Sequence, residues 1–196
     1  MYALVEDNTI IKTYNNPRGM TIGGVQYPQN IHSLWTESDL NAIGIYTVVY
    51  DDTNKKDEDW YINTDQTLTF AGGKVTATYG TATARAIADR NGTDEDGVEL
   101  DPVVVIKGLK TVKKEIFDRQ AAGLLAKYDW YIIRNTEAST AIPSAITDYR
   151  TAVRAKCNSM QTQIDNASDV DALAALFTYT ETGRPLGEWP TDPNEE

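Results

Sequence analysis

Six apolar residues in the second half of the chain recur at intervals that constrain the fold more than any other feature. The intervals are 3, 4, 4, 3 and 4 residues, through Ile146, Tyr149, Val153, Cys157, Met160 and Ile164. An α-helix repeats every 3.6 residues, so these intervals place all six side chains on one stripe. The stripe predicts a long helix paired along its length with a second helix. Cys157 lies inside the stripe, which favours a buried structural cysteine over a reactive nucleophile.

The segment before this helix supplies the partner that the stripe requires. From Pro102 onward the apolar positions again follow a helical period, through Leu109, Val112, Ile116, Phe117, Ala121, Leu124 and Tyr128. A third short helix is expected to begin at Ser168, with Asp171 completing a capping box. Residues 102–180 are therefore predicted to form a helical hairpin domain. Residues 181–196 contain three prolines and are expected to form an extended acidic tail.

The first eighty residues have the patterns of β structure instead. "YALVE" and "TIIKTY" are separated by Asp7-Asn8, which is typical of a hairpin turn, and Gly72-Gly73 separates two later strand-like segments. In "KVTATY" apolar and polar residues alternate, as in a strand with one buried face. Residues 1–80 are therefore predicted to form a β-rich N-terminal domain.

A short helix is expected to interrupt this β domain. Thr36 is a good N-cap, and Asp39, three residues later, supplies the acidic half of a capping box. Gly44 can adopt the left-handed conformation that ends a helix. The stretch "TESDLNAIG" is thus expected to form a helical clip over one end of a small sheet, with Trp35 packed beneath it.

Residues 81–101 separate the two halves and are predicted to form an acidic flexible linker. The stretch contains two glycines, ends in Asp101-Pro102 and has little to bury, so the halves are expected to move independently. A calcium loop starting at Asp89 fails because Asp94 occupies the position that requires glycine. The expected fold class is α+β: a small β-rich N-terminal domain with a short helical clip, followed by a C-terminal helical hairpin and a short third helix.

The net charge of −11 is unevenly distributed along the chain. Residues 1–101 carry 7 basic and 16 acidic side chains, residues 102–158 carry 10 and 5, and residues 159–196 carry 1 and 8. This arrangement bears on docking surfaces rather than on the fold, and a solvated face of the basic helices is the favoured interpretation of it. It disfavours nucleic-acid binding, because the flanking acidic blocks would repel phosphates.

Several function classes find no support in the sequence. The N-terminus lacks the pattern of a signal peptide, and no apolar run reaches the roughly 18 residues that cross a bilayer, so we expect a soluble protein without membrane contact. His32 is the one histidine, and no nucleophile, zinc or phosphate-binding motif accompanies it. The 29 acidic residues could include a glycosidase pair, but the sequence does not identify one. We therefore expect a non-enzyme without cofactor or metal.

A candidate docking site lies between the two long helices. Trp130, Tyr131 and Ile133 belong to a run too apolar for an ordinary loop, so it either caps the helix pair or binds another molecule. Arg134 follows it, and Lys110, Lys113 and Lys114 precede it on the first long helix. Apolar anchors with a basic rim are typical of protein-docking sites. In the rival interpretation, the acidic linker or tail of the chain covers this surface.

Three stretches resemble proteins of tailed bacteriophages: "GGVQYPQNIHSLWTESDLNAIGIYTVV", "DWYIIRNTEASTAIPSAITDYRTAVRA" and the closing "EWPTDP". They are similar to proteins of the tail-fibre region, including tail-fibre assembly proteins and related virion components. The resemblance implies a β-rich front, a helical rear and no catalytic motif. It also implies a tail-fibre or distal-tail protein as partner, acting in the host cytoplasm during assembly and then in the virion.

The resemblance leaves several roles open. The leading expectation is a protein that assembles or caps a tail fibre and is retained in the particle or released from it. The alternatives are a stoichiometric component joining fibre to tail or baseplate, and a carbohydrate-binding tail-tip module. Homo-oligomerisation also remains open.

Overall fold

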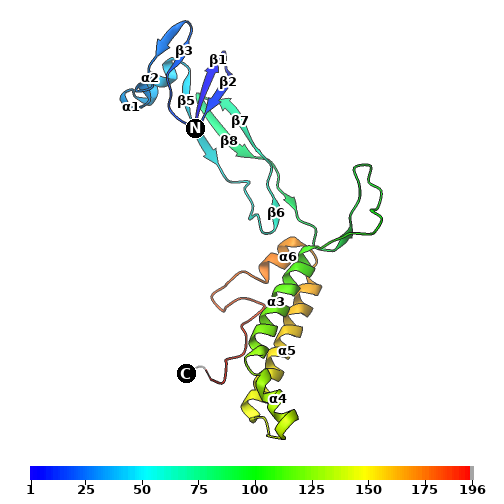
Figure 1. Ribbon diagram of the computed structural model, residues 1–196. Helices are drawn as coiled ribbons and strands as arrows, with labels where there is room; N and C mark the ends of the chain where they lie inside the picture. Colours follow the sequence, from blue (N-terminus) through cyan, green and yellow to red (C-terminus); the bar gives the residue numbers. More distant parts are fainter. Residues whose placement is uncertain (195–196) are drawn as a thin grey trace. The chain divides into compact units, whose positions relative to one another are not determined.

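A computed structural model describes residues 1–194, and it has the α+β architecture expected from the sequence (Figure 1). The chain divides into two compact units, of which the first is Met1–Thr83 and the second begins at Ala84. Strands dominate the first unit and helices the second.

A five-stranded sheet in the order β2-β1-β5-β8-β7 forms the centre of the first unit. Its strands are β1 (Tyr2–Glu6), β2 (Thr9–Tyr14), β5 (Ile45–Asp51), β7 (Gln66–Ala71) and β8 (Lys74–Tyr79). Neighbouring strands are antiparallel, except that β5 and β8 run parallel. The outermost strands β2 and β7 also contact each other, so the sheet curls toward closure.

Two predicted turns shape this sheet. Asp7 and Asn8 have φ values of 49° and 61°, and Gly72 and Gly73 have values of 58° and 73°. Positive φ at both central residues is the requirement of a two-residue hairpin turn whose twist matches that of the strands. These turns join β1 to β2 and β7 to β8, which confirms both hairpin predictions.

The first unit also contains smaller elements outside this sheet, the last of which continues into Ala84 of the second unit. They are β3 (Met20–Ile22), β4 (Val25–Tyr27), α1 (Ile31–Leu34), α2 (Glu37–Ala42), β6 (Tyr61–Ile62) and β9 (Thr83–Ala84). Strand β3 pairs with β4, and β6 pairs with β9, the strand on which the unit ends.

The helical clip is confirmed in detail. Thr36 caps α2 through the Asp39 backbone N–H, and the Asp39 carboxylate accepts from the Thr36 backbone N–H at 3.0 Å. Gly44 follows with φ 84°, and a Cβ atom there would lie 2.5 Å from the Val5 carbonyl oxygen. Glycine is therefore needed both for the conformation and for the close approach to β1. Trp35 was expected beneath the clip, but it is 38% exposed, and its ring makes a T-shaped contact with the Tyr27 ring at 5.8 Å between ring centres.

The two sides of the sheet carry separate cores. One side buries a small-residue cluster of Ala3, Val5, Val48, Val75 and Ala77, in which Val75 and Ala77 confirm the alternation of β8. The other cluster, Tyr14, Ile31, Leu40 and Ile45, lies where α1 and α2 cover the sheet. The clip thus provides the apolar cover that the second side of the sheet requires.

Helices α3 (Leu109–Ala126) and α5 (Ser144–Asn166) pack side by side in the second unit, with α6 (Val170–Ala175) following α5. All six residues of the predicted α5 stripe are buried, with exposed fractions of 6% or less. On α3, Phe117 and Ala121 are buried as expected, whereas Val112 is exposed. The cap of α6 is Asp169, not Ser168, because the Asp169 carboxylate accepts from the Ala172 N–H at 2.8 Å.

Residues 89–107, which we call the β-arm, precede α3 and contain β10 (Arg90–Asn91) and β11 (Val105–Ile106) (Figure 1). The two strands pair antiparallel. Much of the segment expected as an irregular linker therefore has hydrogen-bonded structure and belongs to the second unit.

Candidate partner-binding surface

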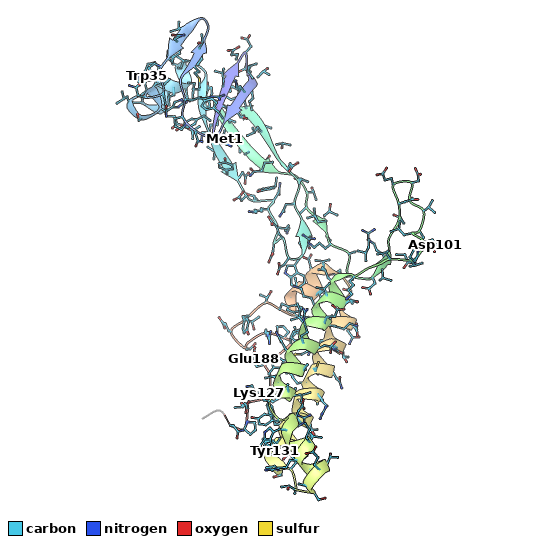
Figure 2. The ribbon with its side chains drawn as sticks, viewed as in Figure 1. Met1, Trp35, Asp101, Lys127, Tyr131 and Glu188 are labelled. Carbon is cyan, nitrogen blue, oxygen red and sulfur yellow. The ribbon has the colours of Figure 1, made fainter. Side chains whose placement is uncertain are left out.

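A short helix that was not predicted from the sequence connects α3 to α5 and contains the candidate docking run. This helix, α4 (Asp129–Ala138), begins two residues after α3 ends and contains no buried residue. Figure 2 labels Tyr131 on it. The apolar run Trp130–Ile133 therefore belongs to a helix that packs little against the rest of its unit.

Arg150 of α5 holds this junction in place. Its side chain is buried, and Nη1 donates to the Leu125 carbonyl oxygen at 2.7 Å and to the Asp129 carboxylate at 2.9 Å. One guanidinium thus links the last turn of α3 to the first turn of α4. A charged group out of water needs such partners, because desolvation without them is costly.

Four predicted site residues, Trp130, Tyr131, Ile133 and Arg134, lie together on α4, and we call them the α4 cluster. The Arg134 guanidinium carbon lies 4.6 Å from the Trp130 ring centre and 5.2 Å from that of Tyr131. Trp130 remains 49% exposed and Ile133 56%. The cluster thus presents a cation–π stack and apolar area on one exposed helix.

The three predicted lysines do not join this cluster. Lys110 donates to the Asp165 carbonyl oxygen at 2.9 Å, and Lys114 forms an ion pair with the Asp165 carboxylate at 2.7 Å. Lys113 lies 5.4 Å from the Phe177 ring centre. All three are in the first turns of α3, whereas α4 follows its last turn. At 1.5 Å per residue, the end of α3 lies about 18 Å from Lys114 and about 24 Å from Lys110. The expected basic rim is wrong: these lysines contact the end of α5 and the segment after α6.

The C-terminal segment packs along α3 instead of extending into solvent. Leu186 is fully buried, and the Trp189 indole N–H donates to the Gln120 side chain at 3.0 Å. Asp192 accepts from the Tyr128 hydroxyl and pairs with Lys127 at 3.2 Å. Lys127 and Glu188 are labelled in Figure 2. Even with this segment in place, Trp130 and Ile133 stay exposed, so the described part of the tail does not cover these two residues.

The contact between Asp192 and Tyr128 shifts the pKa values of both side chains. The Tyr128 hydroxyl donates to Asp192 and holds the pKa of that carboxyl below its usual range. The same hydrogen bond, together with desolvation, raises the pKa of Tyr128 to about 12. The Asn194 backbone N–H adds a further bond to Asp192 at 3.0 Å. These contacts clasp the tail to the residue that precedes α4.

The other candidate sites give less evidence of a function. His32 lies in α1, with its ring centre 4.6 Å from the Tyr2 ring centre and 5.8 Å from that of Tyr14. Within residues 1–194, no three His, Cys, Asp or Glu side chains gather in a way that could hold a metal ion. No helix in the described residues is both long and apolar enough to span a bilayer.

Comparison with known proteins adds no family to these observations. No known protein family, curated protein or solved structure matches the chain.

Sequence reasoning missed the residues that position α4. Neither Arg150 nor Asp192 was predicted to have a role in the site. A clue was available for Arg150, because it directly follows Tyr149 of the buried stripe and so lies near the helix seam. Asp192 gave no comparable signal, since acidic residues are common in this chain.

Proposed function

We propose that the chain is a non-enzymatic bacteriophage tail protein that binds a tail fibre through the α4 cluster and assists the assembly or capping of that fibre. The observation that carries the proposal is the stack of the Arg134 guanidinium on the Trp130 and Tyr131 rings, in which Trp130 remains 49% exposed. The resemblance of three sequence stretches to tail-fibre region proteins supplies the class of partner.

The composition of the cluster suits protein binding. Tryptophan, tyrosine and arginine are the residues that most often dominate the energy of an interface, and Trp130 and Ile133 are available to a partner. Arg134 is already held against two rings, so little side-chain freedom is lost on binding.

The support beneath α4 strengthens the proposal. Arg150 fixes the helix start from α5, and the Asp192 clasp fixes the preceding Tyr128. The cluster is therefore presented by a supported helix start rather than by a loose loop, and rigid presentation lowers the entropic cost of association.

Co-expression with the fibre protein of the same phage tests the proposal. Trp130→Ala and Arg134→Ala should each abolish co-purification while leaving thermal unfolding nearly unchanged. Trp35→Ala is the matched control, because Trp35 is also exposed but lies in the first unit. Normal binding by a well-folded Trp130→Ala variant would contradict the proposal.

Mass spectrometry of purified particles distinguishes the forms of this function. A transient fibre chaperone is absent from the particle, whereas a component that joins fibre to tail is present in a fixed high copy number. Fibre binding that depends on Trp130 is required in either case.

A further inference from the structure

Residues 8–36 are the longest stretch of the chain without an acidic side chain. The chain carries 29 carboxylate side chains in all, yet this stretch contains only Lys12, Arg18 and His32 as ionisable groups besides its tyrosines. It forms β2, β3, β4 and α1 of the first unit (Figure 1). A region with two cations and no acidic residue attracts anions to an otherwise acidic chain.

Lys12 and Arg18 line the same concavity, which has a volume of about 270 Å³ and lies beside β3. Its remaining lining residues, none of them acidic, are Leu4, Tyr14, Gly19, Met20 and Thr21. Both cations are exposed, and within residues 1–194 neither forms an ion pair. Both are therefore available to the carboxylate of a ligand.

Tyr14 provides a third hydrogen-bond donor at this concavity. Its hydroxyl donates to the Met20 sulfur at 3.7 Å, and a thioether is a weak acceptor. Desolvation raises the pKa of Tyr14 to about 12, so the hydroxyl keeps its proton at neutral pH. The Arg18 guanidinium carbon lies 5.4 Å from the Tyr14 ring centre, a cation–π contact that restrains the arginine. We call Lys12, Tyr14 and Arg18 the basic end.

A second concavity, of about 450 Å³, adjoins the first because both are lined by residues 19–21. It continues to Gln26, Tyr27 and Pro28, and no charged side chain lines it. The Thr21 hydroxyl and the Gln26 amide can each donate and accept hydrogen bonds, and Tyr27 adds an aromatic ring. We call Thr21, Gln26 and Tyr27 the neutral end, and the two concavities together the β3 groove.

The two ends of the groove indicate the class of ligand. A saccharide that carries one carboxylate has a single charge beside hydroxyl groups that donate and accept hydrogen bonds, and its ring has an apolar face for an aromatic side chain. An acidic peptide or a nucleic acid repeats its charge at every unit, but only one end of the groove provides cations. The saccharide therefore matches both ends, whereas the two polymers match only the basic end.

We propose that the β3 groove binds an acidic saccharide, with the carboxylate at the basic end and a neutral sugar unit at the neutral end. The groove lies in the first unit and the α4 cluster in the second. The proposal is thus independent of fibre binding, and the two proposals fail separately.

An NMR titration of the whole chain with a disaccharide of glucuronic acid and a neutral hexose tests this proposal. The amide signals of residues 12–14 and 18–21 should shift in a saturable manner. The same disaccharide with its carboxyl group reduced to an alcohol should bind about tenfold more weakly, because it loses the charged hydrogen bonds. Equal affinity for the two sugars, or no shift up to the solubility limit of the acidic one, would overturn the proposal.

Substitutions at the basic end give the matching protein test. Lys12→Gln/Arg18→Gln should weaken the acidic disaccharide about tenfold and leave the carboxyl-reduced one unchanged. Both side chains are exposed, so circular dichroism should show the variant folded. Lys74→Gln is the control, because Lys74 is also an exposed cation of the first unit but lies on β8, outside the groove. Unchanged affinity in the folded double variant would refute the basic end.

The neutral end and the class of ligand have their own tests. Thr21→Val removes one hydroxyl at nearly constant shape and should weaken the disaccharide about threefold to tenfold, while acetate binding stays unchanged. A glutamate tripeptide and a thymidine trinucleotide should each bind more weakly than the acidic disaccharide. Tighter binding of either would assign the groove to that class of ligand and overturn the saccharide, as would full affinity in Thr21→Val.

Discussion

The α5 stripe and the β-arm carry similar apolar side chains in opposite environments. Six residues of α5 are buried, and Val153 is fully enclosed. The four consecutive residues Val103–Ile106 of the arm are all more than 40% exposed. The stripe has a partner within its own chain, since α3 packs along α5. The arm has no such cover among the described residues.

The difference shows that apolar content alone does not identify a core. The α5 residues recur at the helical period and so gather on one face that α3 can cover. The arm residues are consecutive in an extended strand, so they divide between two faces. A single chain covers the first pattern readily, whereas the second requires cover on both sides.

The largest expected effect comes from placing a charge in each environment. Val153→Asp should destabilise the protein by several kcal/mol, about 3–5, because it buries an unpaired carboxylate. Val105→Asp should change the free energy of unfolding by less than about 0.5 kcal/mol. Urea denaturation measures both. Equal destabilisation by the two variants would contradict the difference in burial between the α5 stripe and the β-arm.

A single buried residue in a proline-rich segment, Leu186, sharpens the comparison between buried and exposed apolar side chains. Leu186 is fully buried although no periodic pattern surrounds it. Leu186→Ala should cost about 2–4 kcal/mol of stability, through lost burial and the cavity left behind. Thermal unfolding compared with Leu34→Ala, an exposed leucine, supplies the matched control. Equal melting temperatures for the Leu186→Ala and Leu34→Ala variants would show that Leu186 lies outside the core in solution.

The features that sequence predicted correctly are local ones. The capping box of Thr36 and Asp39, the turn at Asp7-Asn8 and the α5 stripe each depend on a few neighbouring residues. Their conformation follows from nearby hydrogen bonds or from one repeating interval.

The features that sequence predicted poorly depend on distance in space. Lys114 and Trp130 lie close together in the sequence, in a region rich in basic and aromatic residues. Most of the length of α3 nevertheless separates them in space. Trp189 and Asp192 pack through contacts with residues more than sixty positions away, Gln120 and Tyr128. No periodic pattern in the sequence indicates such contacts, which is why the tail was expected to be extended.

A milder substitution tests how closely the stripe is packed. Cys157→Ser should cost about 1 kcal/mol or less, because the serine hydroxyl can donate to the Asp118 carboxylate that lies 3.8 Å from the Cys157 sulfur. Its fibre binding should be unchanged. Loss of binding in a folded variant would assign Cys157 a role beyond packing.

The smallest expected effect is a pH dependence of the tail clasp. The pKa of Asp192 is lowered in the folded protein, so its stabilising contribution is present above the unfolded value of about 3.9 and is lost as pH falls through the folded value. The NMR signal of the Trp189 indole N–H should report release of the tail below about pH 4.

Asp192→Asn provides the comparison for this titration. An asparagine does not ionise, so the Trp189 signal of the variant should lack the acid transition assigned to Asp192. A transition of the same midpoint in both proteins would assign the release to another carboxyl.

The parallel pairing of β5 with β8 has a consequence for the order in which the first unit folds. The hairpins β1–β2 and β7–β8 close over two-residue turns, but joining β5 to β8 must first close the intervening chain of residues 52–73. The entropic cost of closure grows with the logarithm of loop length, and non-local pairing slows folding. We therefore expect the two hairpins to form early, and the non-local pairings of β1 with β5 and of β5 with β8 to complete the sheet afterwards.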